Sequence, residues 1–126
     1  MASPSYTVLV VDDDASIRFL CRVNLELEGW TVREGAALTQ ARSALDDGDV
    51  DVVLLDVHVG AESGVDFIAE LRDTHPEVAV VLLTGSVGTP TLEGVEVDGV
   101  IAKPFMPTEL TGMVRKLAPR VARGAG

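Results

Sequence analysis

Four aliphatic runs in this sequence each end next to a residue that could take part in chemistry. The runs occupy residues 8–11, 52–55, 80–83 and 100–102. The polar residues that follow them are two neighbouring carboxylates, a third carboxylate, a hydroxyl and an amine: Asp12 and Asp13, Asp56, Thr84 and Lys103. Such runs are typical of strands buried on both faces of a parallel sheet. Because the carboxyl ends of parallel strands meet at one edge, we expect these groups to form one site.

Carboxylates in such a site would repel one another and raise one another's pKa unless a cation joined them. Mg²⁺ is the natural partner, because it binds one or two carboxylates and keeps water and phosphate oxygens as its other ligands. We therefore predict that Asp12, Asp13 and Asp56 surround a Mg²⁺ ion. A carboxylate held in line with a phosphoryl donor can act as a nucleophile and form an acyl phosphate, and Asp56 is the candidate. Lys103 and the Thr84 hydroxyl could stabilise the charge on the phosphoryl oxygens.

Each of these residues also has an ordinary structural explanation. An acidic pair after a strand often caps a helix and leaves the second carboxylate in solvent. Asp56 and Thr84 could close turns, and Lys103 could be a surface charge. The occurrence of all of them in this order, each at the end of a different run, favours one shared site. Lys103 is also one of only two lysines beside eight arginines.

The surrounding pattern predicts an α/β fold in a single domain over residues 1–126, with a core over 6–118 and a flexible tail over 119–126. Strands are expected at residues 6–11, 30–33, 52–56, 78–83 and 100–102, and helices near 16–28, 38–45, 64–74 and 110–117. Residues 85–97 contain glycines and a proline, so a fourth helix there should be short or irregular. Right-handed crossovers then give a doubly wound, flavodoxin-like sheet of five parallel strands in the order 2-1-3-4-5.

Composition narrows the choice of partners and location. The formal net charge of −10 disfavours direct binding to nucleic acid or to an anionic membrane surface. No apolar run approaches the roughly 20 residues of a membrane span, and the first residues lack a signal-peptide pattern. The single Cys21 excludes an internal disulfide, is expected to be buried, and suits a cytoplasmic protein.

The complete set of motifs resembles a bacterial response-regulator receiver domain, over residues 6–117. The matching segments are Val-Leu-Val-Val-Asp12-Asp13-Asp14, Leu-Leu-Asp56-Val-His58 with Gly64 further on, Leu-Leu-Thr84-Gly85, and Lys103-Pro104-Phe105. The resemblance implies a stand-alone signalling module that accepts a phosphoryl group from a histidine kinase or phosphotransfer protein. It would act on a downstream protein target and catalyse only its own phosphorylation and dephosphorylation.

The resemblance also assigns a role to each residue of the site. Asp56 would be the phosphoacceptor, and Thr84 and Lys103 would hold the phosphoryl oxygens. The Lys103-Pro104 peptide bond is expected in the cis form.

For the metal, the resemblance implies that Asp13 binds Mg²⁺ directly and that Asp56 belongs to the same ligand set. Asp12 would bind it chiefly through water, and the backbone carbonyl of His58 would be a further ligand.

Three features depart from the usual pattern of this family. Gly60 stands where members usually carry proline, so the loop after Asp56 could be looser. Val100 stands where an aromatic residue is common, and the segment 85–97 is short and rich in glycine. These departures suggest that phosphorylation is signalled by ordering of residues 85–97 around Thr84 rather than by rotation of an aromatic ring.

Two other functions fit parts of the sequence. Residues 12–16 also match the Asp-x-Asp-x-Thr/Ser pattern of haloacid-dehalogenase-like phosphatases, in which Asp12 would be the nucleophile. The chain is short for that family, and the only acidic residue after Lys103 is Glu109. The second alternative is a pseudo-receiver, an interaction module that is never phosphorylated.

Overall fold

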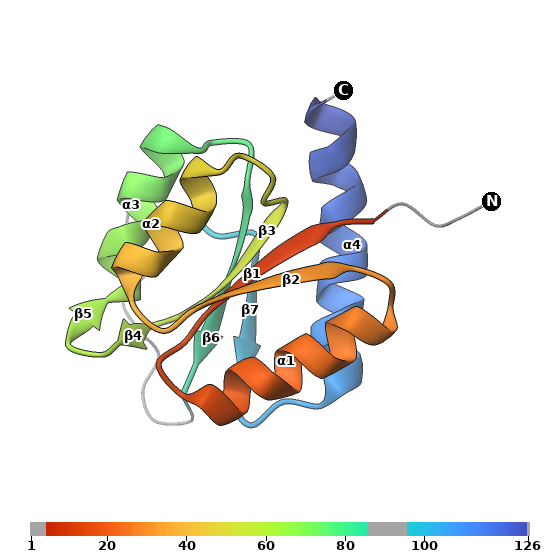
Figure 1. The fold of residues 1–126 in the computed structure, drawn as a ribbon, viewed down its shortest axis with the longest axis horizontal. Helices are drawn as coiled ribbons and strands as arrows, with labels where there is room; N and C mark the ends of the chain where they lie inside the picture. The colour runs from red at the N-terminus through yellow and green to blue at the C-terminus, as the bar shows by residue number, and fades with distance from the viewer. Residues whose placement is uncertain (1–4, 86–95, 126) are drawn as a thin grey trace.

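The structure is a computed structural model that describes residues 5–85 and 96–125, with 119–125 described as backbone. Figure 1 shows the elements in place. In chain order they are β1 (Thr7–Val11), α1 (Ala15–Leu27), β2 (Thr31–Gly35), α2 (Leu38–Asp46), β3 (Val52–Asp56), β4 (His58–Val59), β5 (Glu62–Ser63), α3 (Gly64–Thr74), β6 (Ala79–Thr84), β7 (Gly99–Ala102) and α4 (Pro107–Ala125).

The five longer strands form one parallel sheet in the order β2-β1-β3-β6-β7. Counted along the chain, this is the predicted order 2-1-3-4-5, so the prediction of a doubly wound, flavodoxin-like sheet is confirmed. β3 lies in the centre between β1 and β6. The order changes direction between β1 and β3, which places the ends of these two strands at the switch point where such sheets bind ligands.

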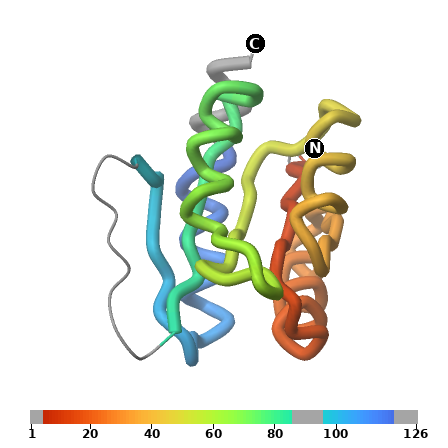
Figure 2. The backbone as a smooth tube through the Cα atoms, turned by 90° about the vertical axis from the view of Figure 1, so that its left-hand side faces the viewer, coloured from red at the N-terminus to blue at the C-terminus, as the bar shows by residue number. Residues whose placement is uncertain are grey.

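The sheet is buried on both faces, as the continuous aliphatic runs predict. In β1, Val8 and Val10 pack into the core on one face, and Leu9 and Val11 pack into the core on the other. Helices α1 and α4 cover the first face, whereas α2 and α3 cover the second (Figure 2). Successive side chains of a strand point to opposite faces, so each run contributes to both cores.

Local signals set the ends of the helices close to the site. Asp14 caps α1 by accepting a hydrogen bond from the backbone N–H of Ser16. Ser63 caps α3 in the same way, through the backbone N–H of Asp66. Both caps satisfy donors that have no partner within the helix, and they fix where each helix begins after its strand.

Two parts of the structure differ from the sequence prediction. The loop after Asp56 contains a short antiparallel hairpin, β4–β5, that was not predicted. The final helix is also longer than predicted, because α4 continues to Ala125 through most of the predicted tail over 119–126. Arginine and alanine dominate this part of the chain and favour a helix, although Pro119 weakens it. The prediction of an irregular fourth helix falls mainly on residues 86–95, outside the described part of the chain.

None of the helices in the described part of the chain combines the length and the apolar character needed to cross a membrane.

Candidate functional site

The register of the sheet brings the predicted residues to one edge. Val11 pairs with Leu55, and Asp56 pairs with Leu83, so β1, β3 and β6 end at nearly the same level. Thr84 pairs with Ala102, which places the last residue of β6 beside the end of β7. Asp56 and Thr84 are the last residues of their strands, and Lys103 follows β7 directly. Asp12 and Asp13 are the first two residues after β1, so the parallel arrangement gathers all five at the carboxyl end of the sheet.

Three carboxylates lie together at this edge. Asp12, Asp13 and Asp56 each offer an oxygen atom, and these atoms all lie within 4.8 Å of one another. The side chain of Asp12 is fully buried, that of Asp56 is 15% exposed, and Asp13 is exposed to solvent. The structure thus brings together the acidic residues that the sequence predicted as a metal site, and the cluster could bind a metal ion.

Lys103 supplies the positive charge beside this cluster. Its Nζ donates a hydrogen bond of 2.7 Å to Oδ2 of Asp12 and lies 3.5 Å from Oδ1 of Asp56. Burial by itself would lower the pKa of the lysine, but the hydrogen bond and charge of Asp12, together with Asp56, outweigh it and raise the pKa. Lys103 is therefore held as a cation. The Lys103-Pro104 bond is cis, as predicted.

The pKa of Asp56 is raised. Burial is the largest cause, and the charge of Asp12 adds to it. Lys103 and a hydrogen bond from the backbone of His58 oppose the shift without cancelling it. The fold thus disfavours ionisation of Asp56 relative to an ordinary carboxyl group, as is common where carboxylates are held together at a functional site.

Asp12 already has a donor on each side-chain oxygen. The backbone N–H of Asp14 donates to Oδ1 at 2.9 Å, and Lys103 donates to Oδ2. Nη1 of Arg18 also donates to the backbone carbonyl of Asp12 at 2.7 Å, while its Nε contacts Glu34 of β2. The sequence did not reveal the role of Arg18, since the contact depends on how α1 crosses β1 and β2.

Thr84 and His58 are placed at the same edge of the sheet, but the contacts predicted for them are not among those of the cluster. Thr84 is buried, and its backbone carbonyl accepts a hydrogen bond of 2.7 Å from the N–H of Lys103. This bond ties the end of β6 to the lysine. His58 is exposed and begins β4, two residues after Asp56. The proposed roles of the Thr84 hydroxyl and of the His58 carbonyl stay predictions.

The hairpin after Asp56 is anchored by two glycines. Gly60 lies at its turn with φ +63°, in the left-handed region that glycine adopts easily, and its N–H donates to Oδ2 of Asp13 at 3.2 Å. Gly64 begins α3 directly against the strand, where a Cβ atom would collide with the backbone carbonyl oxygen of Asp56. Its N–H donates to the carbonyl of Val57 at 2.6 Å. The loop that follows Asp56 is therefore held closely against the cluster and the strand.

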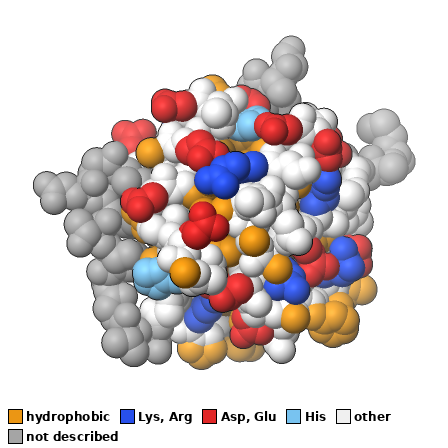
Figure 3. Space-filling view, turned by 60° about the vertical axis from the view of Figure 1, so that its left-hand side comes forward, with side chains coloured by type: hydrophobic (Ala, Val, Ile, Leu, Met, Phe, Trp, Pro, Cys, Tyr) orange, Lys and Arg blue, Asp and Glu red, His pale blue; other side chains and the backbone are white. Residues whose placement is uncertain are grey.

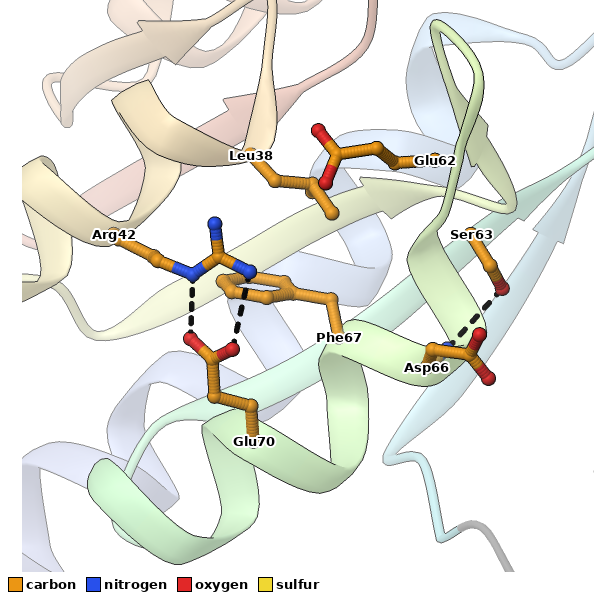
Figure 4. Close-up of a pocket in the computed structure, with 7 residues that line it drawn as sticks. All are labelled: Leu38, Arg42, Glu62, Ser63, Asp66, Phe67 and Glu70. Carbon is orange, nitrogen blue, oxygen red and sulfur yellow. Dashed lines mark hydrogen bonds and ion pairs between the residues drawn. The ribbon is translucent and has the colours of Figure 1, made fainter.

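A separate cavity of about 340 Å³ lies between α2 and α3, away from the acidic cluster. Its lining residues are Leu38, Arg42, Glu62, Ser63, Asp66, Phe67 and Glu70 (Figure 4). The guanidinium of Arg42 lies 5.3 Å from the centre of the Phe67 ring and donates two hydrogen bonds to Glu70, at 2.7 and 3.1 Å. Arg42 lowers the pKa of Glu70. Figure 3 shows basic side chains among carboxylates on this side of the molecule.

Comparison with known proteins identifies the class that this fold and this site define. The family model described as response regulator receiver domain matches residues 8–115. The chain belongs to this family. The match includes residues of every strand in the sheet and each residue of the predicted site.

Individual relatives agree with this assignment. The transcriptional regulatory protein CpxR of Klebsiella pneumoniae is 34% identical over 115 residues, covering 90% of this chain and 49% of CpxR. The phosphate regulon transcriptional regulatory protein PhoB of Pseudomonas aeruginosa is 31% identical over 123 residues, covering 94% of this chain and 54% of PhoB. This chain spans about half the length of these relatives.

A solved structure shows the same likeness. The crystal structure of the receiver domain of NtrX from Brucella abortus has a TM-score of 0.82 and 27% sequence identity, covering 89% of this chain and 98% of that domain. The chain is thus a receiver domain of the kind found in response regulators of two-component systems.

Proposed function

We propose that this receiver domain accepts a phosphoryl group on Asp56 and signals through contacts with other proteins. The observation that carries the proposal is the position of Asp56 at the end of the central strand, with Asp12 and Asp13 in the same cluster and Nζ of Lys103 3.5 Å away. A carboxylate oxygen of Asp56 attacks phosphorus, the bond from phosphorus to the donor breaks, and an acyl phosphate forms. Lys103 then faces the added negative charge.

We further propose Mg²⁺ as the ion of this site. The donor set supports this choice, because it consists of carboxylates, which are hard oxygen ligands, and because the solvent-exposed side of the cluster leaves room for water. Asp13 and Asp56 would hold the ion directly, with the carbonyl of His58. Asp12 would act through water, since both of its oxygens already accept hydrogen bonds. The ion would supply positive charge that offsets the negative charge of the phosphoryl oxygens.

The partners belong to the same proposal. The donor would be a sensor histidine kinase or a phosphotransfer protein, and the recipient of the signal a downstream protein. The charge of −10 supports an output through protein contacts rather than through direct binding of this domain to nucleic acid. We place the protein in the cytoplasm. Cys21 is compatible with this location, because burial raises the pKa of its thiol to about 12 and keeps it protonated. The chain would catalyse only its own phosphorylation and dephosphorylation.

Phosphorylation by a small-molecule donor tests the proposal. We expect the wild-type protein, incubated with acetyl phosphate and Mg²⁺, to gain one phosphoryl group by intact mass. Reduction of the acyl phosphate with borohydride, followed by peptide sequencing, should locate it at residue 56. Asp56→Asn should gain none, whereas the matched variant Asp14→Asn should gain it as the wild type does, because the side chain of Asp14 caps α1 and asparagine can cap it as well.

The same experiment separates the alternatives. Labelling at Asp12 instead of Asp56 would indicate the haloacid-dehalogenase-like phosphatase. No labelling of the folded wild-type protein would indicate a pseudo-receiver and overturn the proposal.

A further inference from the structure

The turn of the β4–β5 hairpin reaches across to the acidic cluster. The backbone N–H of Gly60 donates to Oδ2 of Asp13 at 3.2 Å, although the two residues are 47 positions apart in the chain. We propose that Gly60 is a positioning residue, whose N–H fixes the orientation of the Asp13 carboxylate for the divalent ion. This inference rests on the proposed function, because it concerns the same ion.

The fold holds this N–H in place from both ends of the hairpin. Val59, directly before the turn, is 2% exposed and packs into the core beneath α2 and α3. Ser63, after the turn, pairs with His58 and caps α3. The N–H of Gly60 is therefore presented by an anchored turn of the backbone.

Asp13 is the carboxylate of the cluster that most needs such a partner. The two oxygens of Asp12 already have donors, and Asp56 has Lys103 and the backbone of His58. Asp13 is exposed, so without a contact its side chain would sample several rotamers and lose that freedom when an ion binds. The bond from Gly60 occupies Oδ2 and leaves Oδ1 for the ion. Hydrogen bonds of this kind orient metal ligands in many proteins.

The identity of residue 60 makes this contact possible. A proline has no N–H to donate, and its φ of about −65° is incompatible with the value of +63° at this position. A Cβ atom on Gly60 would meet no atom within 4 Å, so the restriction comes from the backbone and not from crowding. Asparagine tolerates the left-handed region better than most residues and keeps the N–H.

A pair of substitutions at Gly60 tests the role of the N–H. We expect Gly60→Pro to weaken Mg²⁺ binding about tenfold, as measured by isothermal titration calorimetry, because the outer hydrogen bond to the ligand is lost. Gly60→Asn keeps the donor and should bind Mg²⁺ with an affinity close to that of the wild type. Equal affinities in all three proteins, or an equal loss in both variants, would overturn the positioning role.

Amide exchange provides a measurement that does not depend on the folding of Gly60→Pro. In the metal-free protein, the Gly60 amide should exchange slowly in the wild type and in Asp14→Ala, and faster in Asp13→Ala. Both aspartate variants remove one charge from the same loop, but only Asp13 accepts the bond from Gly60. Equal exchange rates in Asp13→Ala and the wild type would contradict the proposal.

The two proposals fail in different ways. If the wild-type protein binds no Mg²⁺ at all, the ion of the proposed function is wrong, and the positioning role falls with it. If the wild type binds Mg²⁺ and Gly60→Pro binds it equally well, only the role of Gly60 is wrong.

Discussion

Aspartates stand at both ends of the central sheet, and the two ends use them differently. At the amino end, Asp51 accepts a hydrogen bond of 2.9 Å from the backbone N–H of Thr7. Asp98 accepts one of 2.8 Å from the N–H of Val80 and another of 3.0 Å from Arg72. Each carboxylate there lies against donors at the start of a strand. These hydrogen bonds tie the strand beginnings to their neighbours.

At the carboxyl end, the aspartates face one another. Asp12, Asp13 and Asp56 lie within reach of a common ion, and Lys103 contacts two of them. Their mutual repulsion costs stability that the amino end does not lose. The comparison shows that the same residue type maintains the fold at one end and is held in an unfavourable arrangement at the other. Sites that bind ions or transfer groups commonly carry such a cost.

Removal of the positive charge of Lys103 should have the largest effect on stability. Lys103→Met leaves the fully buried carboxylate of Asp12 without its charged partner. We expect the free energy of unfolding to fall by about 3 kcal/mol, because a buried charge that loses its partner is strongly destabilising. Urea unfolding at neutral pH measures this change.

Lys116→Met is the matched control for this prediction. Lys116 is exposed on α4, and it is the only other lysine of the chain, so the same substitution there should change stability little. If the two variants lose equal stability, Lys103 does not hold the carboxyl end together.

Asp98→Ala tests the amino end and should have an intermediate effect. The change removes the acceptor for the N–H of Val80 and the partner of Arg72. A loss of about 1.5 kcal/mol is expected, since hydrogen bonds to a charged group are stronger than neutral ones. Asp73→Ala, an exposed change on α3, serves as the control in the same urea titration. An unchanged stability of Asp98→Ala would remove the contrast between the two ends.

The smallest effect concerns the pH dependence of Asp56. Burial and the charge of Asp12 raise its pKa above 3.8, so the folded protein binds a proton there more tightly than the unfolded chain. The contribution of Asp56 to stability therefore falls as pH rises from 3.8 through the folded pKa, and the loss is complete above that pKa. Asp56→Asn cannot ionise and should be more stable than the wild type at neutral pH.

The advantage of Asp56→Asn should shrink as the pH is lowered toward 3.8, when the wild-type carboxyl group is protonated as well. Thermal unfolding across this range measures the difference, with Asp73→Asn as the exposed control. A difference that stays constant with pH would show that ionisation of Asp56 does not limit stability.

Much of the sheet could be predicted because a strand that is buried on both faces has a recognisable run of aliphatic residues. Runs such as residues 52–55 contain only aliphatic side chains, and a strand covered by helices on both faces requires this pattern. The clustering of Asp12, Asp13 and Asp56 followed from topology, because Asp56 ends β3 and the other two come directly after β1. The order of the strands then decides which ends meet.

Contacts made by the backbone could not be predicted in the same way. The bonds from Gly60 to Asp13 and from Arg18 to the carbonyl of Asp12 depend on the path of a loop and on the crossing of a helix. Neither path is encoded by residue type at one position. The length of α4 was underestimated because the composition of residues 119–126, with a proline and two glycines, is typical of a frayed tail, whereas the helix continues to Ala125.

The close approach of Gly64 to Asp56 has a consequence for protein engineering. Transplanting the acidic cluster onto another α/β scaffold would require more than copying its carboxylates and lysine. The recipient would need a residue without a side chain where its next helix starts, since any larger residue would push against the peptide group of the grafted aspartate. A successful graft would thus have to carry the strand, the loop and the first helical residue as one cassette.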